Sequence, residues 1–245
     1  MPGVRFLSHA LTHVGLVRHR NEDACLDRRD IGLWAVADGM GGHEAGDYAS
    51  TRIVAALQEL QPAGDLEAMA SACAARLSEV DAELRARAAM LGPAAVIAST
   101  VVVLLANQGE YACLWAGDSR LYRWYDGELR QLTIDHSRVQ ELVDAGLLAP
   151  EAAGGHPEAH IVTRAIGGGR LEFGHLREPF ETGDWFLICS DGLTNMLSDA
   201  AIARELSGAQ APAQAAGRLL DRVLGRGAID NVTIVIVAAE PGDRP

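Results

Sequence analysis

The sequence predicts an α+β protein in which two stacked antiparallel β-sheets are flanked by pairs of helices. Strand-like runs occur in blocks and do not alternate singly with helices, which argues against a doubly wound parallel sheet. The predicted helices come mostly in pairs that follow one another directly along the chain. Asp126-Gly127 separates two short strand-like runs, which is typical of a two-residue hairpin and therefore of antiparallel pairing.

The predicted strands are short runs that are apolar or alternate with a period of two, and they are rich in β-branched and aromatic residues. They are Ile31–Ala37, Val96–Ala106, Tyr111–Ala116, Leu121–Tyr125, Glu128–Leu132, Trp185–Cys189 and Val232–Ala238.

Apolar residues three and four positions apart predict the helices. These are Glu44–Leu60, Asp65–Met90, a segment that begins at Ser137, Ser198–Leu206 and Pro212–Leu224. Asp65 is the expected N-cap of the second helix. In the third, Ser137 and Gln140 match a capping box, and Gly146 is expected to end the helix.

Length and composition predict one domain that covers residues 1–245. A chain of 245 residues with 49% hydrophobic content can bury a full core. No Pro-, Ser- or Gly-rich linker divides it, and no repeat is visible. We therefore expect both ends of the chain to share one core.

The formal net charge of −12, with only 21 Lys and Arg residues, argues against a nucleic-acid partner. No run approaches the ~20 apolar residues of a membrane helix, and the N-terminus lacks the apolar stretch of a signal peptide. Cys25, Cys73, Cys113 and Cys189 are far apart and show no C-x-x-C spacing, which indicates reduced core thiols. We expect a soluble, cytoplasmic and monomeric protein.

Short acidic motifs stand beside the predicted strands. They are Asn21-Glu22-Asp23, Asp38-Gly39-Met40-Gly41-Gly42-His43, Gly117-Asp118-Ser119-Arg120, Ser190-Asp191-Gly192 and Asp230-Asn231. In antiparallel sheets one rim collects the ends of some strands and the starts of their neighbours, so these carboxylates can meet there. Only bound cations or protonation would offset so many adjacent negative charges. Oxygen ligands without a His or Cys cluster favour Mg²⁺ or Mn²⁺ over zinc.

Each motif has a simpler interpretation when taken alone. An Asp-Gly pair is most often a turn, and Asp230-Asn231 could simply cap a strand. Arg18, four residues before Glu22, could bind phosphate oxygens bidentately or form a surface ion pair with a nearby acid. His43 could donate a proton to a leaving group or be a structural or exposed histidine.

Read in order, the motifs closely resemble the metal-dependent type 2C family of serine/threonine protein phosphatases in its compact bacterial form. The resemblance extends over nearly the whole chain. It rests on Gly15–Asp23, Val36–His43, Ala116–Tyr122, Leu132–Ser137, Val162–Gly167, Cys189–Leu193 and Asp230–Thr233. One departure is Ala98-Ser99-Thr100, where a Gly-Thr-Thr-like strand is common. A second is Met40, which stands near the position of the acid histidine assigned in eukaryotic relatives.

The resemblance implies a β-sandwich with a two-metal centre, Mn²⁺ or Mg²⁺, at one end. Asp38 is then expected to bridge both ions. One site is completed by Asp191 and Asp230, and the other is served by Asp23, the Gly39 carbonyl and Glu22. Together with Asp191, Asp118 matches a third-metal position. Arg18 matches the phosphate-binding arginine, and His43 is the candidate general acid.

The activity implied by the resemblance is hydrolysis of phosphoserine or phosphothreonine by a water activated between the two metals. The implied partners are phosphorylated proteins, the products of a Ser/Thr kinase, and residues 137–160 match a variable flap beside the active site. Two alternatives remain: a non-catalytic scaffold that binds phosphoproteins, and a phosphatase of small phosphorylated molecules. A role in controlling a secretion apparatus such as type VI is a further hypothesis.

Overall fold

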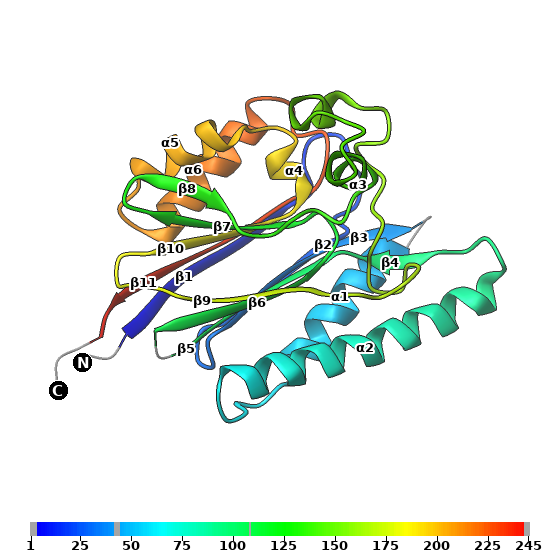
Figure 1. Cartoon of the computed structure of the whole chain (residues 1–245), viewed down its shortest axis with the longest axis horizontal. Coiled ribbons are helices and arrows are strands. Elements are labelled where there is room, and N and C mark those ends of the chain that lie inside the picture. The colour runs from blue at the N-terminus through cyan, green and yellow to red at the C-terminus, as the bar shows by residue number, and fades with distance from the viewer. Residues whose placement is uncertain (1–3, 42–44, 108, 243–245) are drawn as a thin grey trace.

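A computed structural model describes residues 4–41, 45–107 and 109–242. Two antiparallel sheets are stacked face to face, and helices cover both outer faces (Figure 1). This confirms the fold class predicted from the sequence.

The first sheet joins the two ends of the chain. Its strand order is β1 (Val4–His13), β11 (Val232–Pro241), β10 (Trp185–Cys189), β7 (Arg120–Tyr125) and β8 (Glu128–Gln131). Strands β1 and β11 pair along their full length, from Val4 opposite Pro241 to His13 opposite Val232. The predicted Asp126-Gly127 turn closes the β7–β8 hairpin with positive φ angles of 49° and 82°.

The second sheet carries the first two acidic motifs. Its strand order is β2 (Asp23–Arg28), β3 (Leu33–Gly41), β5 (Val101–Asn107), β6 (Glu110–Ala116) and β9 (Gly174–Pro179). A short strand, β4 (Ile97–Ser99), pairs with the end of β3. The predicted strand Val96–Ala106 is thus two strands, because Thr100 leaves the ladder and bonds instead to Asp38 of β3.

Helices α1 (Ala45–Gln58) and α2 (Leu66–Leu91) pack on the second sheet, and α5 (Asp199–Ser207) and α6 (Pro212–Leu224) pack on the first (Figure 1). The expected N-cap of α2 is present, since Asp65 accepts a hydrogen bond from the N–H of Ala68. Ser198, where the sequence predicted the start of a helix, caps α5 by accepting from the N–H of Ala201. Between the sheets lies an aromatic core in which Tyr111 and Phe186 have ring centroids 4.8 Å apart.

Several elements were not predicted. Strand β1 contains polar residues on both faces and acquires its register from β11. Strand β2 overlaps an acidic motif, β9 is an edge strand with alternating exposure, and α4 (Asp191–Thr194) is a single turn. None of these strands has a clear apolar run or period-two alternation of apolar residues in its sequence, and α4, with four residues, is too short for a helical period.

The connection from β8 to β9 contains α3 (Arg138–Asp144) and a 3₁₀ helix, η1 (Pro150–Gly155). Ser137 accepts a hydrogen bond from the N–H of Gln140, and Gly146 follows the helix with a φ of +69°, as predicted. The other half of the predicted capping box differs, because Gln140 Nε2 donates to Asp144 Oδ1 at 2.8 Å. The prediction that residues 137–160 act as a flap concerns this segment.

The described cysteines form no disulfide, and Cys73, Cys113 and Cys189 are buried. Burial raises the pKa of Cys25 to about 11 and that of Cys189 to about 12, so these thiols stay protonated at neutral pH. Among the described residues, no helix is both long and apolar enough to span a bilayer.

Candidate metal centre

A pocket of about 470 Å³ lies at one rim of the sandwich, where the two sheets meet. Its lining includes one acidic residue from each of the five motifs, together with the predicted phosphate-binding arginine: Glu22, Asp38, Asp118, Asp191, Asp230 and Arg18. Gly39 also lines it. The predicted convergence of the acidic motifs is therefore present.

Asp23 and Asp38 form the floor of the site, on neighbouring strands. They lie directly opposite each other in the β2–β3 ladder. Both backbone groups of Asp38 are held by Thr100: its carbonyl accepts from the Thr100 N–H at 2.8 Å, and its N–H donates to Thr100 Oγ1 at 3.2 Å. Asp38 is thus fixed in the sheet, with its carboxylate at the pocket.

Gly39 allows β3 to approach the start of α1 closely. Its N–H donates to the Glu22 carbonyl at 3.0 Å. A Cβ atom on Gly39 would lie 2.0 Å from the carbonyl oxygen of Gly46, so any other residue would push α1 away from the strand. The glycine therefore sets the spacing between Glu22, the pocket and the helix.

Asp191 and Asp118 follow strands of different sheets, β10 of the first sheet and β6 of the second. Asp191 begins α4, and its Oδ2 accepts a hydrogen bond from Asn195 Nδ2 at 3.0 Å. Asp118 follows β6, and its neighbour Gly117 is tied to His136: the His136 N–H donates to the Gly117 carbonyl at 2.9 Å. Each carboxylate is thus attached to an ordered element.

Asp230 stands just before β11 and is paired with Arg18, whose Nη2 donates to Asp230 Oδ2 at 2.7 Å. This contact raises the pKa of the Arg18 guanidinium. The ion-pair interpretation of Arg18 is therefore correct in this structure, and the acid that it contacts is a candidate metal ligand.

The crowded carboxylates perturb one another. Burial, reinforced by Asp23 and Asp191, raises the pKa of Asp38 well above its usual value. The pKa of Asp23 is raised to about 7 by burial, opposed by hydrogen bonds from Thr233 and Ser190. Burial and the charge of Asp191 raise the pKa of Asp118 to about 7. Burial also raises the pKa of Asp191 and of Glu22. All five shifts have the direction expected for buried carboxylates that stand close to one another.

The residues present fit a hard divalent cation. All the acidic donors are carboxylates, which Mg²⁺ and Mn²⁺ prefer. Asp23 Oδ2 accepts from Ser190 Oγ at 2.8 Å, whereas its buried Oδ1 has no hydrogen-bond partner. A buried oxygen of this kind is costly unless an ion or a proton satisfies it.

No three His, Cys, Asp or Glu side chains among the described residues stand ready as a ligand set. Two of the candidate carboxylates have other partners at present: Asp230 accepts from Arg18, and Asp191 accepts from Asn195. Metal binding would therefore require these carboxylates to exchange hydrogen bonds for an ion.

Comparison with known proteins assigns the chain to a family. A family model described as Protein phosphatase 2C matches residues 17–224. The chain belongs to the protein phosphatase 2C family. The resemblance noted in the sequence is confirmed.

Among curated relatives of this phosphatase 2C chain, the serine/threonine protein phosphatase PstP of Mycobacterium tuberculosis is 39% identical over 228 residues, which are 91% of this chain and 43% of PstP. The chain thus spans less than half of PstP. The serine/threonine phosphatase stp of Listeria monocytogenes is 34% identical over 237 residues, which are 92% of this chain and 93% of stp.

Solved structures share the architecture of this chain. PppA, a key regulatory component of T6SS in Pseudomonas aeruginosa, superimposes with a TM-score of 0.89 at 42% identity, covering 96% of this chain and 98% of PppA. The catalytic domain of PstP in complex with two manganese ions superimposes with a TM-score of 0.84 at 36% identity, covering 97% and 99% of the two chains.

Not every predicted site residue can be placed. His43, the candidate general acid, lies outside the described residues. Glu22, Asp38, Gly39, Asp118, Asp191, Asp230 and Arg18 line the pocket, and Asp23 lies behind it next to Asp38. The assignment of each to a particular ion stays a prediction.

Sequence reasoning gave no role to Asn231, which organises the loop that carries Arg18. Its Oδ1 accepts from the Glu22 N–H at 2.8 Å, and its Nδ2 lies 2.9 Å from the carbonyls of Val14 and Arg20. The only signal was its place beside Asp230 in a motif. His160, from the predicted flap, and Asn195 also line the pocket and had no predicted role.

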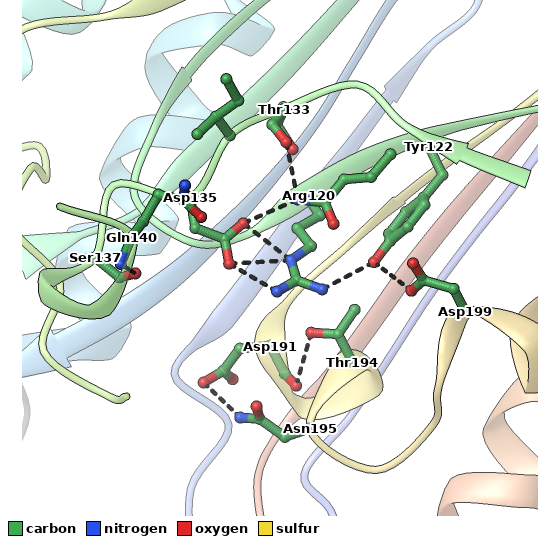
Figure 2. Close-up of polar contacts among 12 residues, drawn as sticks. Arg120, Tyr122, Thr133, Asp135, Ser137, Gln140, Asp191, Thr194, Asn195 and Asp199 are labelled. Carbon is green, nitrogen blue, oxygen red and sulfur yellow. Dashed lines mark hydrogen bonds and ion pairs between the residues drawn. The ribbon is translucent and has the colours of Figure 1, made fainter. Parts of the chain in front are cut away.

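A polar network supports the site from the side of the first sheet (Figure 2). Arg120 forms a two-pronged ion pair with Asp135, through Nε at 2.9 Å and Nη2 at 2.7 Å. Arg120 Nη1 also donates to Tyr122 Oη at 3.0 Å, and that hydroxyl donates to Asp199 at 3.1 Å. The network joins the strand after Asp118 to the base of the predicted flap and to α5.

Proposed function

We propose that this chain is a metal-dependent phosphatase that hydrolyses phosphoserine and phosphothreonine in proteins. The observation that carries the proposal is the convergence of Glu22, Asp38, Asp118, Asp191 and Asp230 on one pocket of a phosphatase 2C chain. The two manganese ions in the related PstP catalytic domain support a binuclear centre.

Bound Mn²⁺ or Mg²⁺ would supply an activated water and would offset charge on the phosphoryl oxygens. In this proposal Asp38 would be a ligand of both ions. Asp191 and Asp230 would help to hold one of them, while Asp23, Glu22 and the Gly39 carbonyl would help to hold the other. Asp118, with Asp191, would hold a third ion. The unpartnered Asp23 oxygen and the raised pKa values support this use of the carboxylates.

Arg18 would orient the substrate. Its guanidinium is at the pocket already, and its present partner Asp230 is one of the proposed ligands. A cation on Asp230 would compete with this ion pair. The Arg18 guanidinium would then be available to bind a phosphoryl group through two parallel hydrogen bonds. His43 stays the candidate proton donor for the departing alkoxide.

The physiological setting proposed is cytoplasmic, with a monomeric enzyme acting on the protein products of a Ser/Thr kinase. The likeness to PppA, at 42% identity over nearly the full length of both chains, favours regulation of a type VI secretion system as the context. Phosphoproteomics of a deletion strain would test this: accumulation of phosphothreonine on secretion-system proteins is expected, and unchanged levels would reject that context.

The decisive experiment measures phosphate release from a phosphothreonine peptide with Mn²⁺, with EDTA, and with the Asp38→Ala variant. We expect release only by the wild-type protein with metal. Metal binding without release would favour a non-catalytic phosphoprotein scaffold. Efficient hydrolysis of small phosphomonoesters, with no competition by phosphopeptides, would favour a small-molecule phosphatase.

A further inference from the structure

A second pocket, of about 490 Å³, lies beside the candidate metal centre on the surface of α1 and α2. It is lined by Arg20, Arg52 and Arg87 together with Tyr48 and Asp47. We call it the arginine groove. Two of these arginines face carboxylates, Arg52 at 2.9 Å from Glu83 and Arg20 at 3.8 Å from Asp47, so the charge that the groove offers to a ligand centres on Arg87.

The side chains of the groove are held in place by one another. Arg52 Nε donates to both oxygens of Glu83, at 2.9 and 3.1 Å, and the Tyr48 hydroxyl donates to the same carboxylate at 2.8 Å. Glu83 therefore balances Arg52 and fixes the Tyr48 ring. These contacts form a rigid floor.

Arg87 lies on that floor. Its guanidinium carbon is 4.1 Å from the centroid of the Tyr48 ring, a cation–π geometry. No ion pair joins Arg87 to any residue that the structure describes, and its side chain is exposed. Stacking restricts the guanidinium while leaving its N–H edge available, so less entropy is lost when it binds a carboxylate or phosphoryl group.

The arginine groove adjoins the pocket of the candidate metal centre through the short segment that carries Arg18 and Arg20. Arg18 lines the metal pocket and Arg20, two residues later, lines the groove. Asn231 holds the Arg20 carbonyl at 2.9 Å, which fixes this segment. Gly46, next to Asp47 of the groove, also lies against Glu22 of the metal pocket: a Cβ atom on Gly46 would be 2.5 Å from Glu22 Oε1.

We propose that the arginine groove binds an acidic side chain of the substrate protein, on one flank of the phosphorylated residue that occupies the metal pocket. This inference rests on the proposed function and adds a substrate preference to it. The continuity of the two pockets through Arg18 and Arg20 favours the same polypeptide as the occupant of both. Arg87 supplies the anion contact, and Tyr48 positions it.

The test uses three phosphothreonine peptides: one with neutral flanks, one with three Glu residues on the N-terminal side, and one with them on the C-terminal side. We expect one acidic peptide to have a KM about three- to tenfold below that of the neutral peptide. Arg87→Ala should remove this advantage without changing kcat or the KM of the neutral peptide. The advantage should also shrink as salt is added.

Arg222→Ala is the matched control, because Arg222 is an exposed arginine on α6, in the opposite helical layer, and is paired with Glu205. It should leave all three KM values unchanged. Tyr48→Leu keeps Arg87 and removes its stacking platform, so it should lose part of the preference. Equal KM values for the three peptides on the wild-type protein, or an equal effect of Arg87→Ala and Arg222→Ala, would overturn the proposal.

A binding measurement separates this proposal from the proposed activity. Fluorescence anisotropy of a labelled, unphosphorylated acidic peptide needs no catalysis. Binding by the wild-type protein that weakens at least threefold in Arg87→Ala would support the groove even if no substrate were hydrolysed. Equal anisotropy for both proteins, alongside normal hydrolysis of the neutral peptide, would reject the groove and leave the phosphatase activity intact.

Discussion

Asp23 lies directly opposite Asp38 across the β2–β3 ladder, so two carboxylates face one another inside a sheet. Like charges in this arrangement destabilise a sheet. Asp23 has a buried oxygen without a partner, and the pKa values of both residues are raised. The fold therefore maintains an electrostatic conflict at the position where a cation would relieve it.

Asp38→Asn is predicted to separate stability from metal binding. Removing one of the two facing charges should stabilise the metal-free protein, by on the order of 1 kcal/mol at pH 8, and should abolish the stabilisation by Mn²⁺. Urea denaturation with EDTA and with Mn²⁺ measures both effects. Asp30→Asn, at an exposed ion pair, is the control. An Asp38→Asn protein that is less stable in EDTA would contradict the argument.

The stability of the metal-free protein should fall as the pH rises from 5 to 8. The pKa values of Asp23 and Asp118 are about 7 in the folded protein, against 3.8 for an ordinary Asp. At pH values between these two numbers, the folded state therefore binds more protons than the unfolded chain. Stability then decreases with pH across that window and levels off above it. Chemical denaturation in EDTA at several pH values tests this, and a rise in stability over the same range would disprove it.

The acidic motifs were predictable because each signal is local. Asp118 and Asp191 each follow an apolar strand, and antiparallel pairing brings such ends to one rim. The contacts of Asn231 with Val14 and Arg20 join positions more than 200 residues apart. No local pattern indicates such contacts. For the same reason β1 was not predicted. Its register is set by pairing with β11, and its own sequence has no clear alternation.

Asn231→Ala is predicted to loosen the loop that carries Arg18. The substitution removes three hydrogen bonds, to Glu22, Val14 and Arg20, and leaves their backbone groups to find other partners. We expect a loss of about 2 kcal/mol in the free energy of unfolding and a higher KM for phosphopeptides. Denaturation and steady-state kinetics measure the two. A normal KM with reduced stability would show that the loop does not depend on Asn231 for substrate binding.

Arg18→Ala should raise KM more than it lowers kcat, because the proposed metal ligands remain. It also removes the partner of Asp230, so the apparent affinity for Mn²⁺ should increase, as one competitor for that carboxylate is lost. Kinetics with a phosphothreonine peptide and a Mn²⁺ titration of activity test the two effects. A collapsed kcat with unchanged KM would place Arg18 outside substrate binding.

Asp135→Asn is predicted to be among the most damaging substitutions outside the pocket. Arg120 and Asp135 are partly buried, with 27% and 15% of their side chains exposed, and the variant leaves the guanidinium without its counter-charge (Figure 2). Because solvent screens such a pair in part, we expect a loss of about 2 kcal/mol, below the ~3–5 kcal/mol of a fully buried pair. Because Asp135 lies at the base of the connection that contains α3, hydrogen exchange in residues 137–160 should also increase. If the variant is less stable but hydrogen exchange in residues 137–160 is unchanged, the ion pair stabilises the sheet and does not hold this segment in place.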